Sequence, residues 1–207
     1  GIEPALTSPN VELWTNARAI RLIADSAGRK VEAVEVERNG ETIRVGASLV
    51  VVSCGAVNSA ALLLRSANGA QPNGLANSSG LVGRRYMAHL ATMMQGFNPL
   101  RKNDTIFQKT VAINDFYFCG PRTRYPLGHI QSQGRTHGVM AQTVVPWVPL
   151  RAYDVWVSRG VDWLAMSEDL PREDNRVTIA ADGRIRLLYR PNNLAAHRML
   201  VKETTRM

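Results

Sequence analysis

Cysteine is scarce in this sequence of 207 residues, which contains only Cys54 and Cys119. Zinc sites and disulfide frameworks need several cysteines at regular spacings, and this pair offers none. Cys54 ends an apolar run, so we expect it to be a small buried hydrophobe. The sequence therefore predicts no metal site and leaves the redox compartment open.

Long hydrophobic runs are missing as well. Apolar residues make up 45% of the sequence, which favours a globular chain. No run approaches the roughly 18 residues that span a bilayer. Residues 1–4 lack the basic and apolar regions of a signal peptide. We therefore predict no membrane span and no signal peptide in this chain, and the localisation stays unknown with the cytoplasm slightly favoured.

Acidic residues are too few to balance the basic ones. The sequence contains 25 Lys and Arg but only 17 Asp and Glu, which gives a net charge of +8. A basic chain can bind nucleic acid, and steep salt dependence of binding would reveal it. The arginines are scattered, however, with Arg84 and Arg85 as their only adjacent pair, and no basic run is interleaved with aromatic residues. We therefore predict no nucleic-acid partner.

The first part of the chain predicts a β-meander. Residues 31–37 alternate apolar with acidic side chains, as a half-buried strand does, and residues 42–45 read as the returning strand. Between them, Asn39-Gly40 is a strong hairpin signal. Two further short strands are expected at residues 11–14 and 19–24.

A buried strand and a helix come next. Residues 47–54 contain the run Leu-Val-Val-Val, which is apolar on both faces and predicts a central strand between two layers. Gly55 breaks this strand, and Asn58 or Ser59 can cap a helix over residues 60–67. In a doubly wound sheet such a glycine admits a cofactor, and the helix start faces a phosphate. A tight structural turn without a ligand explains the same pattern.

The second half is richer in aromatic residues and predicts antiparallel strands. A loop rich in Gly, Asn and Ser over residues 73–83 precedes a domain boundary near His89. A hairpin around Gly183 and a helix after Asn193 follow. The helical pattern reaches Met207 without a terminator, which predicts an internal piece of a longer protein. Strands are expected over residues 110–119, 138–147, 162–169, 176–180 and 184–189.

Polar and aromatic residues of this half are more often structural than functional. His89, His129 and His137 share no metal spacing, although His129 and His137 lie where they can face a substrate. The carboxylates around residue 171 are typical of a solvated turn. The aromatic residues are expected in the core rather than in a ligand platform: Phe116, Tyr117, Phe118, Trp147, Trp156 and Trp163.

Several motifs occur together along the chain. Residues 55–59, Gly-Ala-Val-Asn-Ser, are followed by Leu-Leu-Leu and Ser66. They resemble the second signature of the FAD-dependent glucose–methanol–choline (GMC) oxidoreductases, although Ala60 and Ala67 replace the usual proline and glycine. Further segments resemble other parts of the same family. Residues 11–36 and 50–55 resemble its distal FAD domain, and residues 74–89 resemble the part after the signature. The later part of its substrate domain is resembled by residues 167–171, 175–177 and 191–193.

The resemblance implies an α+β fold in two parts. Residues 1–90 would form an incomplete FAD-domain lobe with a β-meander, a buried strand and a helix. Residues 91–207 would form a partial substrate domain, with an antiparallel sheet and helices on one face. Intact family members move a hydride from the CH–OH carbon of a small alcohol, such as a sugar or polyol, to FAD. By resemblance, the residues that contribute to the FAD site are Ala19, Cys54, Gly55, Ala56 and Asn58.

The same resemblance implies that essential parts lie outside this chain. No Gly-x-Gly-x-x-Gly opens a helix here, and the family's catalytic histidine comes later than these motifs. We therefore predict no catalytic residue in this chain, no FAD bound to it and no activity when it is alone. The exposed first lobe predicts a homodimer. The alternative is a free-standing binding module derived from the family.

Overall fold

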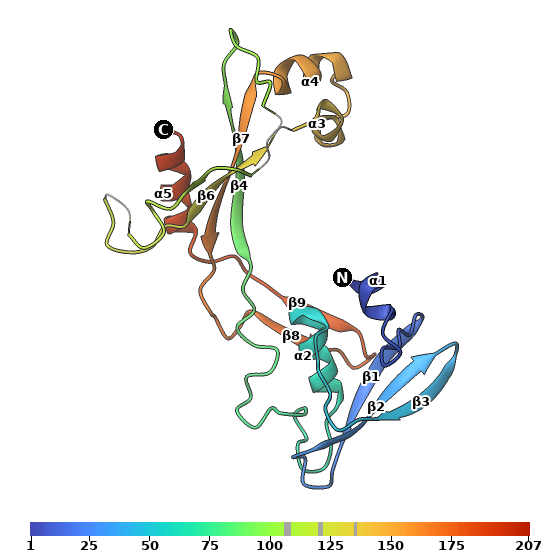
Figure 1. Ribbon diagram of the computed structural model, residues 1–207. Coiled ribbons are helices and arrows are strands. Elements are labelled where there is room, and N and C mark those ends of the chain that lie inside the picture. The colour runs from blue at the N-terminus through green and yellow to red at the C-terminus, as the bar shows by residue number, and fades with distance from the viewer. Residues whose placement is uncertain (106–108, 120–121, 135) are drawn as a thin grey trace. The chain divides into compact units, whose positions relative to one another are not determined.

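The computed structural model describes residues 1–105, 109–119, 122–134 and 136–207. They form two compact units: Gly1–Tyr86 with Pro171–Tyr189, and Met87–Leu170 with Arg190–Met207. Antiparallel sheets and a few helices build both units (Figure 1), which agrees with the predicted α+β class. The units differ from the predicted domains 1–90 and 91–207 because Pro171–Tyr189 groups with the first unit. The two predicted domains stay a prediction.

The first unit contains the predicted meander. Strands β1 (Ala17–Ala24), β2 (Val31–Arg38) and β3 (Glu41–Gly46) form an antiparallel sheet in the order β1-β2-β3. Arg38 pairs with Glu41 across the turn. The turn residues Asn39 and Gly40 have φ angles of +52° and +84°, the left-handed conformation that this hairpin requires. The predicted hairpin is therefore confirmed. A short helix, α1 (Ile2–Leu6), precedes the sheet.

Helix α2 (Gly55–Arg65) packs on this sheet through a small apolar core. The buried side chains of Leu22 in β1, Leu62 in α2 and Leu75 in the following loop form its centre. A hydrogen-bonded serine joins the two elements, because Ser66 Oγ accepts from the Leu22 amide at 2.9 Å and donates to the Leu62 carbonyl at 2.6 Å. The end of α2 is thereby fixed to β1.

The segment before α2 corrects a prediction. Residues 47–54 are not a strand buried on both faces, since no described strand pairs with them. Leu49 and Val51 are 78% and 77% exposed, whereas Val50 and Val52 pack against the apolar core. Cys54 is exposed rather than buried. Residues 11–14 also form no strand. An apolar run becomes a central strand only where neighbouring strands supply hydrogen bonds.

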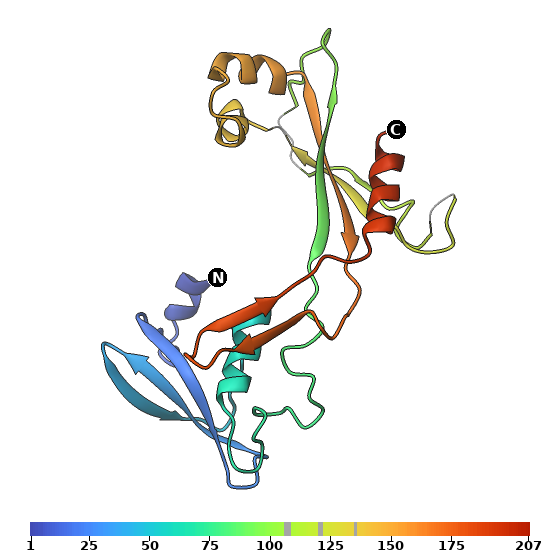
Figure 2. The ribbon, with the colours of Figure 1, turned by 180° about the vertical axis from the view of Figure 1, so that it is seen from behind.

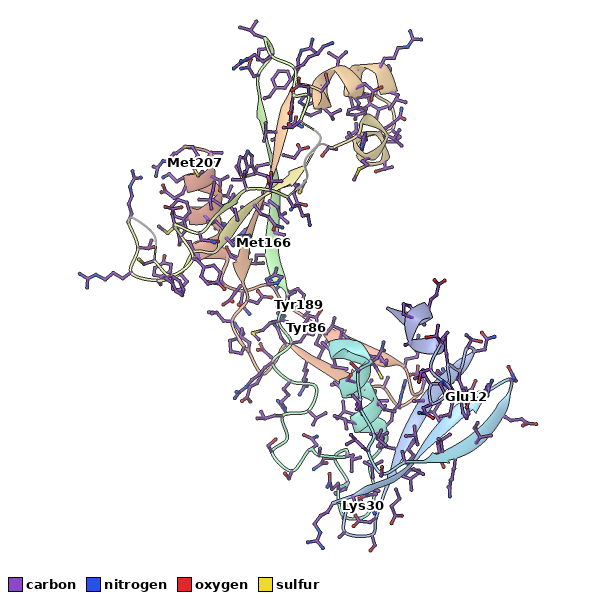
Figure 3. The ribbon with its side chains drawn as sticks, viewed as in Figure 1. Glu12, Lys30, Tyr86, Met166, Tyr189 and Met207 are labelled. Atoms are coloured by element: carbon purple, nitrogen blue, oxygen red, sulfur yellow. The ribbon has the colours of Figure 1, made fainter. Side chains whose placement is uncertain are left out.

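A second hairpin completes the first unit. Strands β8 (Arg176–Ile179) and β9 (Ile185–Leu188) pair antiparallel around Gly183, as predicted. The Val177 amide donates to the Gly83 carbonyl at 2.7 Å. At the same open end of the hairpin, the rings of Tyr86 and Tyr189 meet edge to face with centroids 5.6 Å apart (Figure 3). These contacts join the loop after α2 to the hairpin.

The second unit is built on a four-stranded antiparallel sheet in the order β4-β7-β6-β5. Helix α5 (Leu194–Thr204) lies along the sheet in both views (Figures 1 and 2). Their shared core includes Leu127, Ile130 and Ala165 from the sheet side and Ala196 and Leu200 from the helix. The strands are β4 (His89–Phe97), β5 (Ala112–Ile113), β6 (His129–Gly134) and β7 (Gly160–Glu168).

In part of this unit the secondary structure differs from what local propensity predicts. Residues 138–147, rich in β-branched side chains, were expected as a strand but form α3 (Gly138–Val144), which packs on α4 (Leu150–Val157). Residues 110–119 contribute only β5, and residues 106–108, 120–121 and 135 lie outside the described part. No strand or helix expected from the sequence covers β4, β6 or α4. Strand propensity depends on neighbours as much as on the residue, and β4 gains its pairing from the distant β7.

Candidate functional site

The turn at the start of α2 gathers four of the five residues predicted to contact FAD. Cys54 precedes the helix, Gly55 and Ala56 begin it, and Asn58 follows in its first turn. All four are exposed. The amides of a first helical turn have no acceptor within the helix, and aligned peptide dipoles make this end partly positive. The turn therefore offers N–H donors to an anionic group such as a phosphate.

Gly55 has the backbone conformation that the turn requires. Its φ is +78°, and a Cβ built there meets no atom within 4 Å, so the space beside it is open. The Cys54 amide donates to Ser59 Oγ at 3.0 Å. Ser59 therefore closes the turn from inside the helix, although it was predicted to cap a helix over residues 60–67. Close access and free amides fit the cofactor contact that the resemblance implies.

Ala19, the fifth predicted residue, lies elsewhere in the first unit. It belongs to β1, pairs with Val36 of β2 and is exposed. The structure places it on the meander and not in the α2 turn. The assignment of all five residues to an FAD site stays a prediction.

A cavity of about 790 Å³ lies in the second unit, where β7 ends beside the starts of β4 and β6. The strand ends contribute His89, His129 and the β7 residues Met166–Glu168, with Met166 labelled in Figure 3. The segment between β5 and β6 contributes the aromatic rings, and the start of α5 contributes one amide side chain. Those residues are Tyr117, Phe118, Tyr125 and Asn193.

Glycine is required where the aromatic segment enters the sheet. Gly128 has φ of +140°, and a Cβ there would lie 2.0 Å from the Met166 carbonyl oxygen. The amides of Leu127 and Gly128 both donate to the Phe116 carbonyl, at 3.0 and 3.2 Å. The chain thus doubles back on itself tightly, and this holds the rings of residues 117 and 118 at the cavity.

Hydrogen bonds orient the polar groups at the cavity. His129 Nδ1 lies 2.7 Å from Asn114 Oδ1. That oxygen only accepts, so Nδ1 carries the proton and Nε2 is the acceptor of the neutral ring. Asn193 Nδ2 donates to the Glu168 carbonyl at 2.8 Å. This bond fixes the end of β7 against the start of α5.

A buried polar network lies between the sheet and α5. Ser167 Oγ donates to the Leu127 carbonyl at 2.6 Å and lies 3.1 Å from His197 Nδ1. His197 Nε2 lies 2.8 Å from Thr92 Oγ1. Because the Ser167 proton is already used, His197 donates through Nδ1 and accepts through Nε2 as a neutral ring. Burial lowers the pKa of His197 below its ordinary value, which favours the same neutral form.

Several predictions about single side chains change. His89 and His129 line the cavity, whereas His137 is the exposed residue before α3. Phe116 is buried as expected, but Phe118 and Trp147 are 80% and 82% exposed. No motif indicates that a loop brings aromatic rings to the strand ends. Within the described ranges, no cluster of His, Cys, Asp or Glu is suited to a metal, and no helix is long and apolar enough to cross a membrane.

Comparison with known proteins gives one family. The family model for GMC oxidoreductases matches residues 2–91, which include the whole α2 turn. Paromamine 6'-oxidase of Streptomyces fradiae is 42% identical over 96 residues, covering 46% of this chain and 18% of that protein. The 6'''-hydroxyparomomycin C oxidase of Streptomyces lividus is 41% identical over 97 residues.

A longer but weaker match extends into the second unit. The 2-methyl-1,2-propanediol dehydrogenase of Mycolicibacterium austroafricanum is 26% identical over 194 residues, covering 87% of this chain and 35% of that protein. This chain therefore matches only about a fifth to a third of the length of these curated relatives. Their names describe two of those proteins as oxidases and the third as a dehydrogenase.

Proposed function

Because this chain belongs to the GMC oxidoreductase family through residues 2–91, we propose that it contributes to the cofactor and substrate sites of an FAD-dependent alcohol oxidoreductase. The observation that carries the proposal is the cavity in the second unit, which combines imidazoles, a carboxylate and aromatic rings at the strand ends. Concave, mostly apolar walls with a few polar groups are typical of small-molecule sites.

The α2 turn is the part of this chain that we propose to hold the cofactor. When bound, FAD supplies an acceptor for hydride from a CH–OH carbon. The amides that begin α2 would donate to an anionic part of the cofactor, and Gly55 would leave room for close approach. We propose that this contact is too small to retain FAD alone and that the chain alone is inactive.

The cavity residues would bind and orient the alcohol. His129 Nε2 can accept a hydrogen bond from a hydroxyl group, since its Nδ1 is engaged by Asn114. The rings of Tyr117 and Phe118 can cover the apolar face of a sugar or polyol. We propose that the second unit supplies part of the substrate-domain wall in this way.

A free-standing binding module is a second candidate, and one observation favours it. Among the described residues, all those that line the cavity belong to the second unit and none to the first. The two candidates differ in turnover. A module binds a polyol without ever oxidising it, whereas a domain of an oxidoreductase supports oxidation once the remaining parts of the enzyme are present.

The cofactor part of the proposal is tested by nuclear magnetic resonance on the 207-residue chain. Millimolar FAD should shift the amide signals of Gly55, Ala56 and Val57, and Gly55→Val should reduce these shifts. Gly183→Val is a matched control, because Gly183 has φ of +79° and equally open space. Signals at the α2 turn that do not move, or yellow flavin retained stoichiometrically through gel filtration, would contradict it.

The exposed first unit also supports a proposed homodimer. Leu49 and Val51 present apolar surface next to the sheet, and both β1 and β3 are edge strands. Unpaired edges and exposed apolar patches favour association, and a two-fold dimer is the commonest closed form. Residues 1–90 are the proposed interface.

A further inference from the structure

The charge of the cavity differs from the charge of the chain. Basic residues outnumber acidic ones by 25 to 17. Among the described residues that line the cavity, however, Glu168 is the only one with a formal charge at neutral pH when the histidines are neutral. The lone carboxylate, and not the basic charge of the chain as a whole, favours a ligand that carries positive charge.

The carboxylate of Glu168 is available to such a ligand. The side chain is exposed, and no described residue forms an ion pair with it. The backbone around it is fixed, because its carbonyl accepts from Asn193 and its strand pairs with β4 through His89. A ligand therefore meets a carboxylate whose position is set by the sheet and whose charge is not neutralised by a neighbour.

A second acceptor in the cavity comes from His129 on β6, whereas His89 on β4 lies directly opposite Glu168. His129 lies opposite Met166, two residues before Glu168 on the neighbouring strand. Since Asn114 Oδ1 holds the proton on Nδ1, Nε2 presents a lone pair. A carboxylate and a neutral imidazole nitrogen both accept hydrogen bonds, so the complementary ligand is rich in donors. An ammonium group, with three N–H donors, meets this requirement better than a hydroxyl group.

Aromatic rings form the remaining wall. Tyr117 and Phe118 meet edge to face, with centroids 5.1 Å apart and planes at 82°, and Phe118 is 80% exposed. The face of such a ring attracts a cation and also packs against the C–H groups of a sugar. The same wall therefore suits the organic part and the charged part of an amino-substituted alcohol.

We propose that this cavity selects alcohols that carry a primary ammonium group, such as amino polyols, over the neutral alcohols of the same shape. Glu168 is the residue that determines this preference by accepting the ammonium group, with His129 Nε2 as a second acceptor. The inference rests on the proposed function, in which the cavity binds the alcohol substrate.

The test compares two probes that differ in one group. Glucamine carries an ammonium group where sorbitol carries a hydroxyl, and both are titrated at pH 7.5 into the 207-residue chain while amide signals of the cavity are followed. We expect glucamine to bind about three- to fivefold more tightly, the size expected for one exposed charge pair. In Glu168→Gln the two affinities should become equal, whereas Glu41→Gln, an exposed carboxylate on β3, should leave the ratio unchanged.

The outcomes separate this inference from the proposed function. If glucamine and sorbitol bind equally and Phe118→Ala weakens the binding of both, the ammonium preference is overturned. The proposal that the cavity binds an alcohol would still be supported. Binding of neither probe would overturn both. A glucamine preference that survives Glu168→Gln would also overturn the role given to Glu168. Loss of the preference with rising NaCl, together with its loss in Glu168→Gln, would support it.

Discussion

The α2 turn and the cavity of the second unit differ in how the chain builds them. Four of the residues in the turn lie within a stretch of five positions, 54–58. The cavity takes its residues from the starts of β4 and β6, the end of β7, the loop after β5 and the start of α5. A site made from one stretch is recognisable as a motif, whereas a site made from distant strand ends appears only when the sheet is formed.

The largest effect is expected at the glycine that the cavity depends on. In Gly128→Ala the new Cβ would lie 2.0 Å from the Met166 carbonyl, in a conformation that alanine rarely adopts. We expect a loss of about 3–5 kcal/mol in the free energy of unfolding, measured by urea titration. Gly40→Ala is the control, because its Cβ meets nothing within 4 Å, and it should cost only about 1 kcal/mol. Similar losses in both variants would show that packing at Gly128 is not special.

The α2 turn depends on a weaker constraint in the first unit. Ser66→Ala removes the acceptor of the buried Leu22 amide and releases the end of α2 from β1. Leaving that amide unsatisfied should cost about 1–3 kcal/mol in urea unfolding. Ser26→Ala, at an exposed loop position, should change stability by less than about 0.5 kcal/mol. An unchanged unfolding midpoint for Ser66→Ala would mean that the apolar core alone holds α2.

The same contrast explains how much the sequence predicted. The two hairpins at Asn39 and Gly183 follow from local turn chemistry, and α5 follows from its apolar period, so all three were predicted correctly. The strand β4 contains methionine, alanine and glycine, and only pairing with β7 makes it a strand. The opposite error occurred at residues 47–54, where a strand was predicted and none forms. An apolar run without neighbouring strands leaves Leu49 and Val51 exposed. Short-range interactions decide the two hairpins and α5, whereas distant strands decide β4 and residues 47–54.

The network under the cavity predicts a dependence on pH. The folded state lowers the pKa of His197 by burial, so the unfolded chain binds the proton more readily. Stability should be full above the unfolded pKa of about 6.5 and should fall as the pH drops through that value toward the lower pKa of the folded state. Urea midpoints between pH 5 and pH 8 should show this decline in the parent chain and in the exposed-site control His137→Gln. His197→Gln should decline less, and an equal slope in all three would contradict the assignment.

The smallest effect on folding is expected at the exposed segment before α2. Leu49→Ser with Val51→Ser replaces side chains that are 78% and 77% exposed, so the free energy of unfolding should change by less than about 0.5 kcal/mol. Self-association should change much more, because these side chains give the proposed dimer its apolar surface. Sedimentation equilibrium should show a dimer for the parent chain and a shift toward monomer for the double variant. Replacing Val155 and Trp156 by serine, at exposed positions on α4 in the second unit, is the matched control and should leave the dimer intact. A parent chain that stays monomeric at high concentration would contradict the dimer, and a dimer lost only in the α4 control would move the interface to the second unit.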